Sequence, residues 1–325
     1  MTDDDASLRR RQRLLADLTS AVEHFGASGP DVLDLKMARQ ALIELTKAFE
    51  VFRPYRGVRK LTMFGSARTA PHDPIYELAR SVAAEVAAAG WMVVTGAGPG
   101  IMAAGIEGAG RARSFGVNIE LPFEQGANAF IADDPKLVEM RYFFTRKLML
   151  TKESSAFVVL PGGFGTLDET FELLTLLQTG KAEPAPVVLL ETPGGTYWHR
   201  FDAFLREAAV EPGWIHDEDR SLYRIVRSAS EAVDEVLGFY ANFRSARVVD
   251  GRLILRLGQL PEPAVLAELT ARFADLLGPE GLEPVEASRA EILDDDDVEA
   301  ARLAVDLAGR HPGRFRQLLD ALNGR

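Results

Sequence analysis

Glycines and carboxylates crowd into one short stretch near the middle of the chain, VVLPGGFGTLDETF at residues 158–171. An apolar run ends at Pro161, three glycines follow within four residues, and Asp168 and Glu169 come next. Glycine lets backbone N–H groups approach a ligand closely, and the N-terminus of a following helix attracts an anion. An ionised carboxylate there could stabilise a cation-like transition state or orient a water molecule. The segment therefore predicts a phosphate site with an acid at its edge.

Thr166 and Glu169 also fit a purely structural role. Their spacing, Thr-x-x-Glu, is that of a capping box, in which the glutamate side chain bonds back to the first residue of its helix. Spacing alone leaves both roles of Glu169 open, the helix cap and the acid of a phosphate site.

Two further expected strands end in small residues. Gly65-Ser66 closes one apolar run, and TGAGPG at 95–100 closes the next. Because ligands bind beyond the carboxyl ends of strands in a doubly wound sheet, three such ends would converge into a phosphate cradle. Each loop taken alone is also consistent with a tight turn. Two common nucleotide motifs are absent, since Gly180-Lys181 is followed by alanine and residues 96–100 read G-x-G-x-G rather than G-x-G-x-x-G.

Arg146-Lys147 lies among large apolar residues, which are Tyr142, Phe143, Phe144, Met149 and Leu150. Paired basic residues on helices are usually solvated, and that interpretation stays open. A cation fixed on so apolar a helix favours a binding or catalytic role for Arg146.

These residues need a scaffold, and from residue 59 the pattern alternates between strand and helix. We expect strands over 60–66, 91–98, 114–122, 156–163 and 185–191. We expect helices over 74–90, 99–112 (opened by Pro99), 136–154, 166–180 and 197–210. Almost wholly apolar strands that alternate with helices indicate a parallel sheet covered on both faces. The prediction is a doubly wound, Rossmann-like α/β core over residues 58–241.

Both ends of the chain differ from this core. Residues 1–57 predict an N-terminal extension of two helices separated by GASGP. Residues 242–325 predict a small α+β extension, with a hairpin around Asp250-Gly251 and helices over 262–277 and 297–322. No chemistry is evident in this tail. The acidic run 294–297 is consistent with a cation site or a solvated loop, and the arginines at 9–11 and 13 with an acidic partner or a solvated face.

Composition excludes several classes of protein. The chain has 325 residues and a net charge of −11, which argues against a general nucleic-acid binder. Cysteine is absent, so neither disulfides nor thiolate metal sites are available. No apolar stretch approaches the roughly 18 residues that span a bilayer, and no secretory signal is visible. We expect a soluble, cytoplasmic protein.

The segment P-G-G-F-G-T-L-D-E at 161–169 resembles the P-G-G-x-G-T-x-x-E signature of the LONELY GUY (LOG) family. Arg146-Lys147, Gly65-Ser66 and G-x-G-x-G-I-M at 96–102 follow in the family's order and spacing. The resemblance covers residues 58–241. It implies hydrolysis of the N-glycosidic bond of a nucleoside 5′-monophosphate, which releases free base and ribose 5-phosphate. Plant members act on cytokinin ribotides, and many bacterial members also cleave AMP.

The resemblance implies that Arg146 and Glu169 form the catalytic pair. Together with the glycine loops it assigns the following residues to the nucleotide or its phosphate: Gly65, Ser66, Gly98, Gly100, Glu124, Lys147, Gly162, Gly163, Phe164, Gly165, Thr166, Asp168 and Thr175. No metal or redox cofactor is implied, and the five histidines form no ligand pair.

Two features set the chain apart within the family. Small members read M-H-x-R-K where residues 143–147 read F-F-T-R-K. The terminal extensions suggest the longer class, which tends toward assemblies larger than dimers, and the apolar helix at 136–153 predicts self-association.

Such proteins are often labelled lysine decarboxylases. A pyridoxal-phosphate enzyme typically places its lysine after a histidine, and no His-Lys dipeptide occurs. The rival of another class is a nucleotide-binding or molybdenum-cofactor carrier without turnover.

Overall fold

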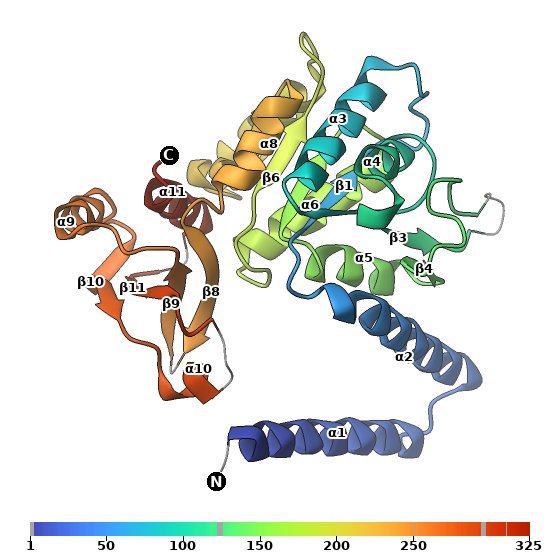
Figure 1. Ribbon diagram of the computed structural model, residues 1–325, viewed down its shortest axis with the longest axis horizontal. Coiled ribbons are helices and arrows are strands. Elements are labelled where there is room, and N and C mark those ends of the chain that lie inside the picture. Colours follow the sequence, from blue (N-terminus) through green and yellow to red (C-terminus); the bar gives the residue numbers. More distant parts are fainter. Residues whose placement is uncertain (1–2, 122–125, 250, 294–296, 310) are drawn as a thin grey trace.

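The computed structural model describes residues 3–121, 126–249, 251–293, 297–309 and 311–325, and contains two sheets (Figure 1). The larger sheet has seven strands in the order β4-β3-β2-β1-β5-β6-β7, all paired in parallel. Its strands are β1 Lys60–Phe64, β2 Met92–Thr95, β3 Ser114–Ile119, β4 Leu137–Met140, β5 Ala156–Val159, β6 Val187–Leu190 and β7 Arg224–Val226. The predicted doubly wound α/β class is confirmed.

Helices cover both faces of this sheet. They are α3 Pro74–Ala88, α4 Ile101–Ala109, α5 Phe143–Lys152, α6 Phe164–Gln178, α7 Tyr197–Leu205 and α8 Ala229–Gly238, with short turns η2 Arg111–Arg113, η3 Arg206–Val210 and η4 Asp217–Leu222. One face packs against α5, α6 and α7, through residues such as Met149, Leu173 and Trp198. The other packs against α3, α4 and α8. Because helices cover both faces, every residue of β1, β2, β5 and β6 is buried, and most of these residues are apolar.

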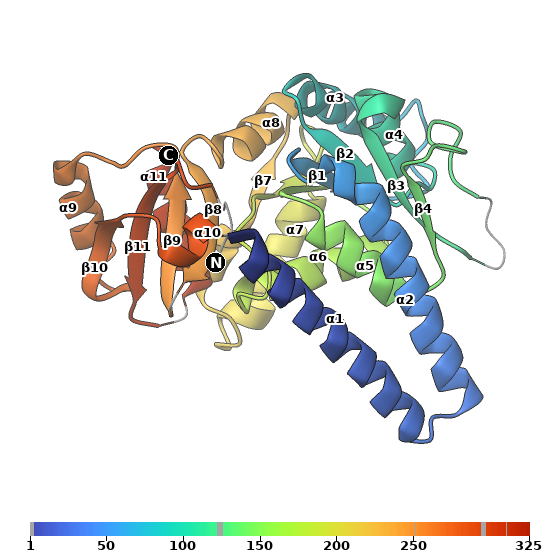
Figure 2. The same cartoon turned by 60° about the horizontal axis from the view of Figure 1, so that its bottom comes forward.

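Two helices precede the sheet, as predicted: α1 Asp3–Ala27 and α2 Val32–Phe52, followed by the turn η1 Arg53–Tyr55. Asp31 caps α2 by accepting hydrogen bonds from the backbone of Leu33 and Asp34. The far end of α2 joins the core, where Phe52 stacks on Phe115 with ring centroids 4.3 Å apart. Helix α1 stands away from both sheets in Figure 1, and Figure 2 shows its N-terminal end on the side of the C-terminal sheet.

The C-terminal residues form a second, antiparallel sheet in the order β10-β11-β9-β8. Its elements are β8 Phe243–Val249, β9 Arg252–Leu257, α9 Pro263–Arg272, β10 Leu277–Val285, α10 Arg289–Leu293, β11 Ala301–Leu307 and α11 Pro312–Leu322. The sheet has a core of its own that includes Phe243, Leu255 and Phe273. The predicted strands on either side of Asp250-Gly251 are present, although Asp250 itself lies outside the described residues. Most of the acidic run 294–297 also lies outside them.

Several predicted elements are wrong. The helix expected over 136–154 is split, because Leu137–Met140 pairs with β3 as the edge strand β4 and only Phe143–Lys152 is helical. A short apolar run cannot be assigned to strand or helix by periodicity alone. The expected helix over 297–322 is likewise a strand, β11, followed by α11, and β7, α8 and β10 were not predicted. Pro99 does not open α4, which begins at Ile101 after Gly100 in a positive-φ conformation.

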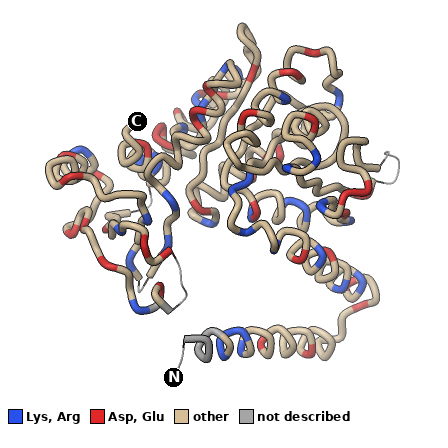
Figure 3. Tube along the Cα trace, viewed as in Figure 1, with Lys and Arg blue, Asp and Glu red and all other residues tan. Residues whose placement is uncertain are grey.

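Charge is spread over the whole trace, with acidic and basic residues mixed along the helices and loops of both sheets (Figure 3). Among the described residues, no helix is long and apolar enough to cross a membrane.

Candidate active site

Three glycine-containing segments meet at the carboxyl ends of adjacent strands β2, β1 and β5. Their backbones contact each other directly, since Ile101 N donates to Ser66 O at 3.1 Å and Ser66 N donates to Pro161 O at 3.3 Å. A Cβ on Gly100 would lie 2.3 Å from Ser66 O, so the close approach requires glycine there. A Cβ on Gly162 would lie 2.1 Å from the Thr166 hydroxyl. The predicted convergence of the glycine loops is therefore present.

Asn128 fixes the middle loop, and the sequence analysis missed it. Its Nδ2 donates to Ala97 O and Gly98 O, both at 2.9 Å, and its backbone N donates to Ala97 O at 2.8 Å. Ala97 has φ of 60°, a conformation that costs a residue with a side chain and that these bonds help to hold. Glu124, a predicted site residue four positions earlier, lies outside the described residues.

Arg146 extends from α5 across the glycine loop of β2. Its Nε donates to Val117 O at 2.9 Å. A Cβ on Gly96 would lie 2.0 Å from Nη2 of Arg146, so the guanidinium rests on a position that only glycine leaves open. Burial lowers the pKa of Arg146, and the negative charge of Glu169 opposes that shift. The solvated alternative for Arg146 therefore does not hold.

Glu169 faces Arg146 and Lys147 from α6 and does not cap its helix. The helix begins at Phe164 with Gly163 as the N-cap and no side-chain cap, which places Thr166 inside the first turn. The Glu169 side chain is only 11% exposed. Burial raises its pKa above the usual range, although the charges of Lys147 and Arg146 act in the opposite direction. The capping-box interpretation is wrong, and the site contains a largely buried carboxylate.

Lys147 joins α5 to α6 through three carboxylates. Its Nζ lies 2.7 Å from Asp168, 2.5 Å from Glu172 and 3.6 Å from Glu169. Burial disfavours the ammonium, but the hydrogen bonds to Asp168 and Glu172 outweigh it and raise the pKa of Lys147. Lys147 is thus a protonated anchor that also places positive charge beside Glu169.

The remaining predicted residues fall into two groups. Gly163 and Gly165 border open space, and Phe164 between them is 94% exposed, so this turn is accessible to a ligand. Thr175 is not brought to the cluster: its hydroxyl donates to Phe171 O, and it lies six residues, or about 9 Å of helix rise, beyond Glu169.

A cavity of about 660 Å³ lies next to the glycine segment of β5. Pro161, Leu167, Tyr197 and Phe201 contribute to its walls, together with Arg200. The Tyr197 hydroxyl donates to Gly162 O at 2.8 Å, which ties α7 to the glycine turn. Sequence reasoning missed this cavity because α7 carries no motif.

The N-terminal extension also reaches the site, through Glu44 of α2. This side chain is buried and accepts hydrogen bonds from Arg141 N at 2.9 Å and from the Thr145 hydroxyl at 2.6 Å. Burial opposes its charge, but hydrogen bonds from Thr145 and Arg141 outweigh that effect and lower the pKa of Glu44. Helix α5 has no cap of its own at Tyr142, so Glu44 anchors the end of the helix that carries Arg146.

Comparison with known proteins adds sequence evidence. Residues 99–236 match the model of a family described as "Possible lysine decarboxylase". A cytokinin riboside 5′-monophosphate phosphoribohydrolase of Mycobacterium marinum is 32% identical over 150 residues, which are 44% of this chain and 75% of that protein. An Arabidopsis thaliana protein of the same description is 38% identical over 91 residues, 28% of this chain; the match spans only 41% of the Arabidopsis protein.

Solved structures with a similar arrangement are more distant. A molybdenum cofactor binding protein of Rippkaea orientalis gives a TM-score of 0.40 at 18% identity, with 55% of this chain and 94% of that chain covered. The molybdenum cofactor carrier protein of Chlamydomonas reinhardtii gives 0.39 at 20% identity, with 55% and 96% covered.

Proposed function

The chain belongs to the LONELY GUY family of phosphoribohydrolases, and we propose that it hydrolyses the N-glycosidic bond of nucleoside 5′-monophosphates to free base and ribose 5-phosphate. The observation that carries the proposal is the largely buried Glu169 facing Arg146 beside the converged glycine segments. The substrates we propose are AMP, cytokinin riboside 5′-monophosphates, or both.

The phosphate would lie at the turn of Gly163 and Gly165. This turn opens α6, and the first backbone N–H groups of a helix have no partner within the helix. The open space around both glycines leaves room for an anion at these donors. Binding there would place the ribose toward Glu169, one and a half turns further along the same helix.

Glu169 would stabilise the positive charge that develops on the ribose as the C–N bond breaks. Its burial strengthens that interaction, because water does not screen a buried charge well. Lys147 and Arg146 favour its ionised form against desolvation. A water molecule then adds its oxygen to the sugar carbon and loses one proton. The departing base takes up one proton, so the hydrolysis balances.

Arg146 would supply the fixed positive group of the site. Its bond to Val117 O holds Nε, so the guanidinium keeps its orientation before substrate arrives. From this position it would donate hydrogen bonds to the phosphate or to the departing base.

Lysine decarboxylation, which the description of the matched family names, does not fit the lysine of this site. Schiff-base chemistry needs a lysine that loses its proton, whereas three carboxylates hold Lys147 protonated.

Product analysis tests the proposal. The purified chain is incubated with AMP, with isopentenyladenosine monophosphate and with adenosine, and free base is measured by chromatography. We expect base from one or both monophosphates and little from adenosine, because losing the phosphate removes several charge-assisted hydrogen bonds. Tight AMP binding without base release from any monophosphate would instead support a carrier role, and equal turnover of adenosine would contradict the phosphate site.

We also propose that the chain forms homo-oligomers and is located in the cytoplasm. The first part rests on α5, where Phe143, Phe144 and Leu148 are about half exposed. Large apolar groups gathered on one helix are typical of surfaces that another chain covers.

A further inference from the structure

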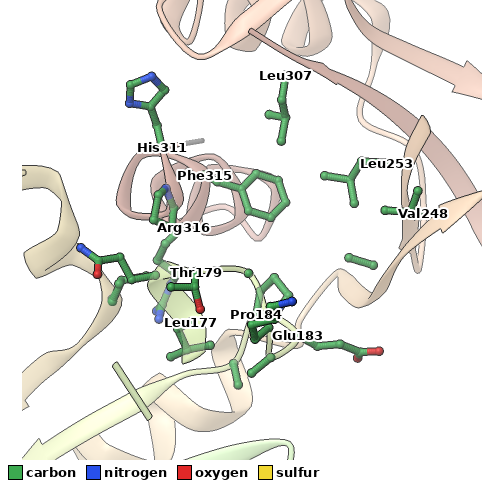
Figure 4. A pocket seen from close by; sticks show the side chains of 18 of the residues that line it. Leu177, Thr179, Glu183, Pro184, Val248, Leu253, Leu307, His311, Phe315 and Arg316 are labelled. Atoms are coloured by element: carbon green, nitrogen blue, oxygen red, sulfur yellow. The ribbon is translucent and has the colours of Figure 1, made fainter. Parts of the chain in front are cut away.

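A second cavity, of about 440 Å³, lies between the larger sheet and the C-terminal part of the chain (Figure 4). One wall is the end of α6 and the loop to β6, with Leu177, Thr179 and Pro184. The opposite wall comes from the C-terminal sheet and α11, and includes Val248, Leu253, Leu307 and Phe315. Its size is in the range of small-molecule sites, and its walls are mostly apolar. None of the predicted site residues lines it.

One end of this cavity carries a buried cluster of charges around Arg316. Arg316 is only 3% exposed; its Nε donates to Asp320 at 2.8 Å, and Nη2 donates to Glu235. Arg224 also contacts Asp320 at 3.0 Å, and Arg325 contacts Glu235 at 2.9 Å. Three guanidinium groups therefore share two carboxylates, but Arg224 and Arg325 are partly exposed to water and only Arg316 is buried.

The third nitrogen of the Arg316 guanidinium has no hydrogen-bond partner. Nη1 is buried, and no described residue accepts from it. Leaving a buried donor without an acceptor is unfavourable, more so for a charged group. The guanidinium carbon of Arg316 lies 4.7 Å from the Phe239 ring centroid, but this contact supplies no acceptor for Nη1. A ligand oxygen beside Arg316 would supply the missing acceptor of Nη1.

We propose that this cavity binds a small organic carboxylate with an apolar body. The apolar part would lie against Leu177, Leu253 and Phe315, and the carboxylate would approach Arg316. Lys181 also lines the cavity and adds a positive charge to it. The site is independent of the nucleotide site, which lies at the opposite end of α6.

Calorimetric titration of the full chain with phenylbutyrate, phenylbutanol and butyrate tests the proposal. Phenylbutyrate should bind at one site with a Kd below about 1 mM. Phenylbutanol should bind at least about tenfold more weakly, because it lacks the charge that Arg316 would pair with. Butyrate should also bind at least about tenfold more weakly, because it lacks most of the apolar body. Saturating AMP should not displace phenylbutyrate.

Two variants locate the binding. Arg316→Gln should weaken phenylbutyrate at least about tenfold while leaving phenylbutanol unchanged, whereas Arg314→Gln, which removes a bond to Asp275 outside the cavity, should change neither. Ala246→Phe fills the cavity from β8 and leaves the charge cluster intact, so it should abolish binding even if Arg316→Gln does not fold. Absence of saturable phenylbutyrate binding, equal affinity for phenylbutanol, displacement by AMP, or full binding to folded Ala246→Phe would each overturn the proposal.

Discussion

At the scale of single residues, Glu169 allows the sharpest test of the mechanism. Glu169→Gln keeps the size of the side chain and removes the charge that would face the ribosyl cation, so base release should fall by roughly 10²-fold or more. AMP affinity should change little, because the ribose is neutral in the ground state. Chromatography of the released base and titration with AMP measure both on the same preparation.

Glu172→Gln is the matched control, because Glu172 contacts the same Lys147 but is more exposed. It should retain turnover within a few-fold of the wild type. Since Glu169 does not cap α6, a Glu169→Gln protein that melts several degrees lower yet keeps near-normal turnover would contradict both the structural assignment and the catalytic one.

The pH dependence of the reaction follows from the raised pKa of Glu169. Protonation removes the catalytic charge, so the rate should fall on acidification through an apparent pKa above the usual 4.5. The sign for stability is opposite. A carboxyl whose pKa is higher in the folded state stabilises the fold below its unfolded pKa, and that contribution is lost as pH rises through the folded pKa. Glu169→Gln should therefore cost no stability at neutral pH, as measured by urea unfolding; an acid limb centred at or below pH 4.5 would contradict the assignment.

How far the sequence predicts the site depends on how local each signal is. Arg146, Glu169 and the glycines belong to short motifs, and the structure brings them together. Asn128 and Glu44 bond to backbone groups of segments about 30 and 97 residues away. No sequence motif indicates contacts over such separations. Thr175 was assigned to the nucleotide although its hydroxyl bonds within its own helix.

At the scale of elements, helix α2 should act on catalysis through α5. Glu44→Ala removes the acceptor of Arg141 N and of the Thr145 hydroxyl, so the start of α5 loses its anchor and Arg146 keeps only its bond to Val117 O as support. We expect kcat for base release to fall about tenfold, with a smaller change in KM, and stability to fall by roughly 1–3 kcal/mol. Steady-state kinetics and urea unfolding measure the two effects.

Glu50→Ala, an exposed position on the same helix, is the control and should change neither quantity. If Glu44→Ala loses stability but keeps kcat, then α2 supports the fold alone and Glu44 is not a positioning residue.

Elements were predictable where pattern and length agreed. Strands β1, β2, β5 and β6 are buried on both faces and stand out as apolar runs. Strand β4 is an edge strand of four residues directly before α5, and its exposed Glu139 left too short an alternation to separate it from the helix. In the C-terminal part, β10 includes glycine and proline. These residues are rare in strands, so the sequence did not predict a strand there.

At the scale of the whole molecule, the exposed side chains of α5 predict self-association. Light scattering at micromolar concentration should give a mass of at least a dimer, because Phe143, Phe144 and Leu148 of one helix are about half exposed and another chain would cover them. Phe144→Glu should lower the measured mass by placing a charge in the contact. A monomeric wild type would refute the proposal; if Phe144→Glu keeps the full mass, the contact lies elsewhere.

The division of the chain into 1–57, 58–241 and 242–325 remains a prediction. The two separate sheets support the boundary near 241. The boundary at 57 is less sharp, because Ala48 and Phe52 of α2 belong to the same apolar core as the larger sheet. The sequence of α2 could not have shown this packing, because an amphipathic helix has the same spacing of apolar residues whichever part of the chain covers its apolar face.

The exposure of helix α1 makes its helicity depend on the protein concentration. From Leu8 onward nearly all of its side chains are exposed, including the apolar Leu14, Leu15 and Leu18. A helix with so few buried side chains is only marginally stable in water. If another copy supplies tertiary support, mass action makes the helicity of α1 fall on dilution while the sheets stay folded. Far-ultraviolet circular dichroism across a hundredfold dilution would then show a partial loss of helix well below the temperature at which the core unfolds.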